Sequence, residues 1–76
     1  MKDLIAYMAR NLVEDGSAVR VEESVVEKTR VYSLRVAESD RGKIIGKQGR
    51  TIRALRVVVG AAALRQNERV TLEVAD

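Results

Sequence analysis

Two glycines three positions apart, Gly46 and Gly49, constrain the fold of this chain more than any other feature. The branched apolar pair Ile44-Ile45 precedes them, and a helical pattern of apolar residues follows from Arg50. Glycine reaches backbone conformations that side chains forbid, and it lets another chain approach closely. The sequence therefore predicts a sharp turn between two helices, with an accessible backbone.

The spacing of apolar residues predicts three helices. The first runs from Asp3 to about Asp15, with Asp3 as its cap and Gly16 where it stops. A short helix capped by Ser39-Asp40 runs to Ile45 and ends at Gly46, and a longer one spans about 50–66. The apolar face of the long helix comprises Ile52, Leu55, Val59 and Ala62.

Alternation of apolar and polar residues predicts three strands, with a turn at Glu27–Thr29 between the first two. The first strand starts at Ala18, and Glu23 interrupts its apolar face, so we expect a partly solvated edge strand. The apolar faces comprise Val19, Val21, Val25, Tyr32, Leu34, Val36, Val70, Leu72 and Val74. Consecutive strands predict an antiparallel hairpin, whereas the crossover through two helices predicts that the second and third strands run parallel. The order α-β-β-α-α-β then gives an α+β fold, a three-stranded mixed sheet covered on one face by helices.

Composition limits what the chain can do. Its 76 residues are enough for one domain, and they contain neither cysteine nor histidine. This removes disulfides, thiolate chemistry, the usual general base and the commonest metal ligand, so we expect no enzyme, no metal and no cofactor. The longest uncharged run, residues 57–64, is far shorter than the roughly 20 residues of a membrane span. The start of the chain lacks the apolar core of a signal peptide, so we expect a cytoplasmic protein.

Positive charge is concentrated around the glycine turn. Positions 41–56 carry six basic residues and no acid, a charge of +6 on a chain whose net charge is +3. Cations at the start of a helix oppose its dipole by roughly 0.3–1 kcal/mol each, a penalty that an incoming phosphate reverses. Unpaired peptide N–H groups at the same helix start favour anions too. The segment is therefore predicted to bind a polyanion through Arg41, Lys43, Lys47, Arg50, Arg53 and Arg56.

Three phosphate-binding motifs compete for this segment. A P-loop is excluded because Gly42 and Gly46 are one residue too close and Gln48 stands where a hydroxyl is needed. A dinucleotide fingerprint is excluded because no Gly-x-Gly occurs. The remaining motif is a G-x-x-G between two helices, the backbone clamp of KH domains.

The segment from Ile44 to Ile52 is similar to the KH signature of two branched apolar residues, Gly-x-x-Gly, two residues and an isoleucine. The element order resembles the prokaryotic, type II arrangement, and a single KH domain would occupy positions 1–76. The chain resembles the small stand-alone bacterial KH proteins of the KhpA type. This resemblance implies a single-stranded RNA running along the turn, with its bases in a groove between two helices and a sheet edge. The implied RNA-contacting residues are Lys43, Ile45, Gly46, Lys47, Gln48, Gly49, Arg50, Ile52 and Arg53.

The resemblance also implies a biological role. Proteins of this type are associated with post-transcriptional regulation or RNA chaperoning, with control of cell growth and shape, and with a larger partner that also carries a KH domain. A homodimer is a second form of association. The competing hypothesis is a KH-folded assembly module that docks on ribosomal RNA within a ribonucleoprotein or maturation complex.

Some residues keep two interpretations. The isoleucines at 44, 45 and 52 would be buried in any such fold, and Arg41, Lys43 and Arg56 suit a solvated surface as well as an RNA contact. Gly60 inside a predicted helix costs about 1 kcal/mol relative to alanine. Its uncharged neighbours, residues 57–59 and 61–63, fit either close packing on the sheet or a self-association face.

Overall fold

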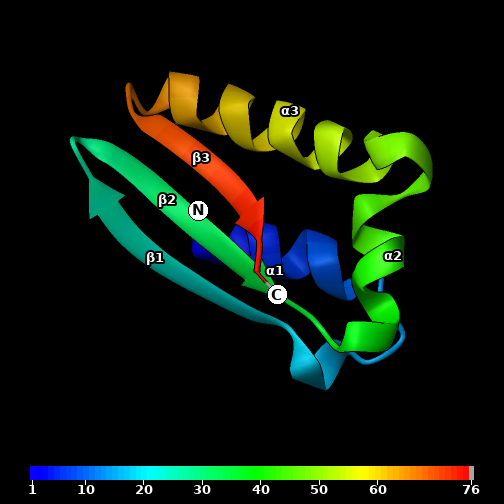
Figure 1. Ribbon diagram of the computed structural model, residues 1–76. Helices are drawn as coiled ribbons and strands as arrows, with labels where there is room; N and C mark the ends of the chain where they lie inside the picture. The colour runs from blue at the N-terminus through cyan, green and yellow to red at the C-terminus, as the bar shows by residue number, and fades with distance from the viewer. Residues whose placement is uncertain (76) are drawn as a thin grey trace.

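A computed structural model describes residues 1–75 of the chain. The helices are α1 (Lys2–Arg10), α2 (Arg41–Ile45) and α3 (Arg50–Arg65), and the strands are β1 (Arg20–Val26), β2 (Thr29–Arg35) and β3 (Arg69–Val74). Single 3₁₀ turns η1 (Gly16–Ala18), η2 (Glu38–Asp40) and η3 (Lys47–Gly49) connect them (Figure 1).

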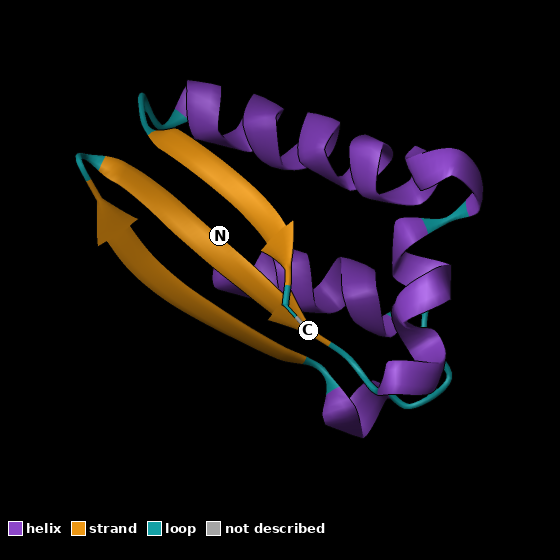
Figure 2. Cartoon of the chain, in the orientation of Figure 1, coloured by secondary structure: helices purple, strands orange, loops and turns teal. Residues whose placement is uncertain are grey.

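The sheet has the order β1-β2-β3, with β1 antiparallel to β2 and β2 parallel to β3. Tyr32 in the central strand lies opposite Glu23 on one side and Leu72 on the other. The predicted hairpin, the parallel pairing and the edge position of the first strand are therefore confirmed. Helices α1 and α3 lie on one side of the sheet (Figure 2), which confirms the predicted two-layer α+β architecture.

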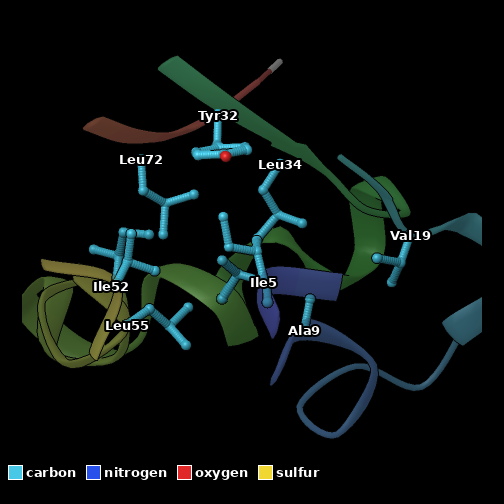
Figure 3. Packing of buried hydrophobic residues seen from close by; sticks show 10 residues of the cluster. Ile5, Ala9, Val19, Tyr32, Leu34, Ile52, Leu55 and Leu72 are labelled. Carbon is cyan, nitrogen blue, oxygen red and sulfur yellow. The ribbon is translucent and has the colours of Figure 1, made fainter. Parts of the chain in front are cut away.

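The core forms where these two layers meet. Tyr32, Leu34 and Leu72, from the helix-facing side of the sheet, are at most 3% exposed. Burial raises the pKa of the Tyr32 phenol, and a ring enclosed in this way cannot stack on a base. Each such large apolar side chain stabilises the fold by roughly 1.5–3 kcal/mol. Figure 3 shows the converging side chains of Ile5, Ala9, Val19, Tyr32, Leu34, Ile52, Leu55 and Leu72.

The first helix is shorter than predicted, since α1 ends at Arg10 rather than near Asp15. Its N-cap is Met1, with no side-chain bond, so the predicted cap at Asp3 is wrong. After Arg10 the chain leaves the helix, and Val13 still packs against the core. This early exit also brings residues 14 and 15 to the start of α2.

The hairpin differs from its prediction in one detail. The turn consists of Glu27 and Lys28 alone, because Thr29 already pairs with Val26. Both turn residues have positive φ, 49° and 68°, the arrangement of a type I′ turn that normally selects Asn-Gly. Strand β1 begins at Arg20, and Val25 near its end is 63% exposed, so the predicted apolar face of this strand is only partly covered.

The prediction for the long helix is confirmed to within one residue at its end. Its buried face comprises Ile52, Leu55 and Val59 as predicted, but Ala63 is the fourth buried residue and Ala62 is half-buried. The predicted stop of the short helix at Gly46 is confirmed as well.

Candidate nucleic-acid interface

The glycine turn joins α2 to α3 at a corner of the molecule, away from the hairpin tip (Figure 1). Gly46 closes α2 with φ 77° and ψ 170°, a region that is essentially restricted to glycine. A Cβ atom built on Gly46 would lie 2.2 Å from Thr51 Oγ1. The tightness of this corner therefore requires glycine at position 46 for two independent reasons.

The second glycine is required less strictly. Gly49 has φ 76° and ψ 15°, a left-handed conformation, and it is the N-cap of α3. A Cβ atom on Gly49 would lie 3.3 Å from Arg53 Nη1, so the Arg53 guanidinium lies against this glycine. Between the two glycines, Gln48 also adopts a left-handed conformation with φ 56°. Three of the four turn residues, Gly46, Gln48 and Gly49, thus have positive φ, and the cationic side chain of Arg53 lies beside the last of them.

Backbone donors remain available at this corner. The N–H of Gly49 donates to the carbonyl of Gly46 at 3.1 Å, and the N–H of Arg50 donates to the carbonyl of Lys47. By contrast, the N–H groups of Lys47 and Gln48 donate to no group within residues 1–75. No side chain caps α3, so no side-chain oxygen competes with a ligand for the positive end of its dipole.

The structure divides the six clustered cations into two groups. Lys47, Arg50 and Arg53 are exposed, and none of them makes a hydrogen bond or ion pair with another described residue. Lys43 is occupied, because its Nζ lies 2.8 Å from Glu14 Oε1 and 3.7 Å from Asp40 Oδ1, and the Glu14 contact raises its pKa. Arg56 Nε donates to the carbonyl of Leu72 at 3.1 Å, and Arg41 is half-buried. The free cations are therefore the three that lie on or next to the turn.

Asp40 has a role that sequence reasoning missed. It was predicted to cap the short helix, but it makes no cap bond and is only 2% exposed. Its carboxylate accepts hydrogen bonds from the N–H of Asp15 at 3.0 Å and of Glu14 at 3.2 Å. These bonds, the Asp15 bond foremost, hold the pKa of Asp40 below its usual value. Asp40 thereby ties the loop after α1 to the start of α2, and no local pattern signals a partner 25 positions away.

The isoleucines that were predicted to contact RNA or to form the core also divide into buried and accessible residues. Ile44 and Ile52 are buried, at 0% and 5% exposure, and belong to the core. Ile45 is half-buried beside the turn. Direct contact of Ile52 with a ligand is therefore not expected, and Ile45 is the isoleucine that a ligand can reach.

Two of the hollows in the described part of the chain bear on the choice of site. One, of about 180 Å³, lies between α3 and β3 and is lined by Arg56, Val59, Gly60, Val70, Thr71 and Leu72. A Cβ atom on Gly60 would meet nothing within 4 Å, so the interpretation that this glycine permits close packing on the sheet is wrong.

The other hollow is larger, about 500 Å³, and lies at the opposite end, between the hairpin tip and the turn from α3 to β3. Its lining mixes the cations Lys28, Arg30 and Arg69 with the carboxylates of Glu27 and Glu68. Arg30 is moreover paired with Glu23 and Glu68. Because acids are interspersed among these cations and are absent from positions 41–56, we assign the interface to the glycine turn despite the greater size of this hollow.

Comparison with known proteins agrees with this geometry. A family model described as "KhpA/KhpB, KH domain" matches residues 2–74. The chain belongs to the KhpA/KhpB family of KH domains. It is similar to the RNA-binding protein KhpA of Chlamydia pneumoniae, at 46% identity over 76 residues that cover 100% of this chain and 97% of the relative. It is also similar to the RNA-binding proteins KhpA of Clostridium perfringens, 42% identical over 97% of this chain and 99% of the relative, and of Aquifex aeolicus, 43% identical over 100% and 96%. No solved structure gives a significant match.

Among the residues that the structure describes, no helix has the length and apolarity needed to cross a membrane. Within residues 1–75, no three His, Cys, Asp or Glu side chains are grouped as metal ligands.

Proposed function

We propose that this chain is a cytoplasmic, non-enzymatic protein that binds single-stranded RNA through the Gly46–Gly49 turn and acts as a post-transcriptional regulator or RNA chaperone. The observation that carries the proposal is the meeting of three unpaired cations with the open backbone N–H groups of Lys47 and Gln48 in the turn before α3. Phosphate oxygens can accept from those N–H groups while Lys47, Arg50 and Arg53 neutralise the strand. The names of the relatives, each an RNA-binding protein, support RNA as the polyanion.

The RNA bases can lie on a surface separate from the turn that binds the backbone. The hollow between α3 and β3 starts beyond the turn, and its walls combine apolar side chains with the Thr71 hydroxyl and the free edge of β3. Ile45 offers an apolar contact nearer the clamp. A groove that takes unstacked bases while a turn clamps one backbone favours single strands, with about four nucleotides per domain.

The decisive test is the double substitution Lys47→Asp with Gln48→Asp. Both side chains are exposed and Asp tolerates the left-handed conformation of Gln48, so stability should change by about 0.5 kcal/mol or less. At the clamp one cation is lost and two anions arrive, so RNA binding should disappear. Binding is measured by fluorescence anisotropy with labelled single-stranded RNA, and folding by thermal melting.

The opposite end of the molecule provides a matched control. Lys28→Asp with Asn67→Asp makes the same charge change, and both residues have positive φ, 68° and 55°, as Gln48 has in the turn. This variant should bind RNA much as the parent does. If the clamp variant binds like the parent, or if the control loses as much affinity, the Gly46–Gly49 turn is not the RNA site.

The exposed face of α3 supports a protein partner for the chain. Val57, Val58 and Leu64 are 72%, 45% and 81% exposed, which is unusual for adjacent apolar residues on one helix. With the sheet-packing role of Gly60 removed, this face supports self-association or pairing with a larger KH-domain protein. Sedimentation of the pure protein that shows only monomer at high micromolar concentration would exclude the homodimer. Stable co-sedimentation with one ribosomal subunit would instead favour the ribosomal assembly role.

A further inference from the structure

Arg56 and Gly60 line the hollow between α3 and β3 from the same side of the helix, because they are four positions apart. Helix α3 runs beside β3, the outer strand of the sheet, at this point (Figure 1). Glycine destabilises a helix interior relative to alanine, and a Cβ atom added at position 60 would meet nothing within 4 Å. Packing therefore does not require this glycine, whereas an open hollow does.

The outer strand orients the Arg56 side chain. Its Nε donates to the Leu72 carbonyl at 3.1 Å, and no other hydrogen bond or ion pair joins Arg56 to the rest of residues 1–75. A guanidinium has five N–H donors in one plane and no acceptor, so four donors on the two Nη atoms are left for a ligand. Because Nε is already held, the guanidinium loses less conformational freedom when those donors bind.

A strand bound at the glycine turn can reach this hollow. Arg56 follows Gly49 by seven residues, which is about 10 Å along a helix. A KH clamp holds about four nucleotides, so a base of the same strand extends to Arg56. The hollow, about 180 Å³, is smaller than the roughly 300–1,000 Å³ of a pocket for a whole small molecule. It therefore suits a single base.

The donors of Arg56 distinguish the four bases by the acceptors that each base offers. Guanine has two neighbouring acceptors, O6 and N7, on an edge without a donor, and arginine binds both at once. Adenine has its N6 amino group beside N7, and in cytosine the N4 amino group flanks the acceptor N3. An amino group that faces a guanidinium leaves donors on both sides without a partner, which is costly where water is displaced. Uracil offers only O4 on that edge. Guanine is therefore the base that matches a guanidinium held in this direction.

We propose that Arg56 makes the hollow between α3 and β3 a guanine-selective subsite. The two Nη atoms bind guanine O6 and N7, and the missing side chain of Gly60 leaves room for the purine ring. This assignment rests on the proposed function, since the Gly46–Gly49 turn must hold the strand that carries the base. Arg56 thus determines which base is preferred, whereas the cations at the turn bind phosphates of any sequence.

The test measures binding of labelled pentanucleotides to the full chain by fluorescence anisotropy. UUGUU contains one guanine in a uracil background, so the strand can slide until its guanine reaches the hollow. It should bind about 5- to 150-fold more tightly than UUAUU, UUCUU or UUUUU, the range expected for one bidentate arginine–guanine pair. Inosine in place of guanine retains O6 and N7 and should bind as guanine does. By contrast, 7-deazaguanine lacks N7 and should lose most of the preference.

Three variants separate base selection from charge and from folding. Arg56→Gln should abolish the guanine preference and change the affinity for UUUUU much less. Arg65→Gln is the matched control, because it removes the same charge at the far end of α3, and it should keep the preference. Gly60→Ala should raise the melting temperature by about 4–8 °C, since alanine favours the helix and its Cβ meets no atom, and yet weaken the binding of UUGUU. A binding loss in a more stable protein does not come from unfolding.

Equal binding of the four pentanucleotides, a preference for adenine or cytosine, or full binding of 7-deazaguanine would overturn the assignment while the clamp stands. So would a guanine preference that survives Arg56→Gln. If no pentanucleotide binds at all, the proposed function fails, and the subsite fails with it.

Discussion

The three glycines around the turn should respond to alanine in a graded way. Gly46→Ala is the most severe, because its backbone lies in a region essentially restricted to glycine, at a cost of about 1–3 kcal/mol for any side chain. The new Cβ would also start 2.2 Å from Thr51 Oγ1 and 2.8 Å from the Thr51 backbone nitrogen, so overpacking adds about 1–3 kcal/mol. The expected loss is therefore about 2–6 kcal/mol. A chain of this size has a total stability of about 4–11 kcal/mol.

Gly49→Ala should cost less. Its left-handed conformation penalises alanine by about 1–2 kcal/mol, and the new Cβ meets only the movable end of Arg53, at 3.3 Å. Gly42→Ala should do the opposite, because the residue lies inside α2 with no atom within 4 Å of an added Cβ. Alanine there is expected to stabilise the chain by about 0.5–1 kcal/mol.

Thermal melting distinguishes these outcomes, since 1 kcal/mol shifts the midpoint by about 4–8 °C in a domain of this size. Gly42→Ala should melt above the parent, Gly49→Ala below it by about 4–16 °C, and Gly46→Ala lower still or already unfolded. Urea titration gives the same order as free energies. A Gly46→Ala protein that melts within a few degrees of the parent would show that the corner is not as tight as its geometry indicates.

Other expectations concern different parts of the molecule. Asp40→Asn should lower the melting temperature by on the order of 10 °C at pH 7, because the amide cannot accept both backbone bonds or pair with Lys43. Since the folded pKa of Asp40 is depressed, its stabilisation is present above about pH 4 and is lost as pH falls through the folded value. The variant should therefore lose less stability than the parent on acidification, and parallel pH profiles of melting would contradict this. Glu27→Asn with Lys28→Gly should raise stability by about 1 kcal/mol in urea titration, because a type I′ turn favours Asn-Gly, while RNA affinity stays unchanged. An RNA loss in that variant would place part of the binding site at the hairpin tip. Anisotropy titrations should also show RNA affinity falling with salt, with a log–log slope of about −0.7 per phosphate neutralised, and should show weaker binding to duplex. Equal affinity for duplex or a flat salt response would count against the clamp.

Local patterns in the sequence determined the element order, the strand pairing and the position of the turn. They do so because periodicity and glycine conformation depend on neighbours in the chain: alternation at 31–36 marks β2, and helical spacing from Arg50 marks α3. The hairpin tip shows the limit of such patterns. Nothing about Glu27-Lys28 suggests a type I′ turn; the register between Val26 and Thr29 imposes it.

Only the tertiary structure decided which side chains are free to act. Six basic residues look equivalent along positions 41–56, but Lys43 is occupied by Glu14 and Asp40, from the loop after α1 and the start of α2. Arg56 is bound to a carbonyl of β3. The end of α1 and the burial of Asp40 were fixed together by bonds across 25 and 26 positions. Likewise, the apolar residues of α3 divide into a covered and an exposed set only once the sheet has taken one side. Whether a side chain is paired or exposed depends on which groups meet in space. Patterns among residues that are neighbours in the sequence do not contain that information.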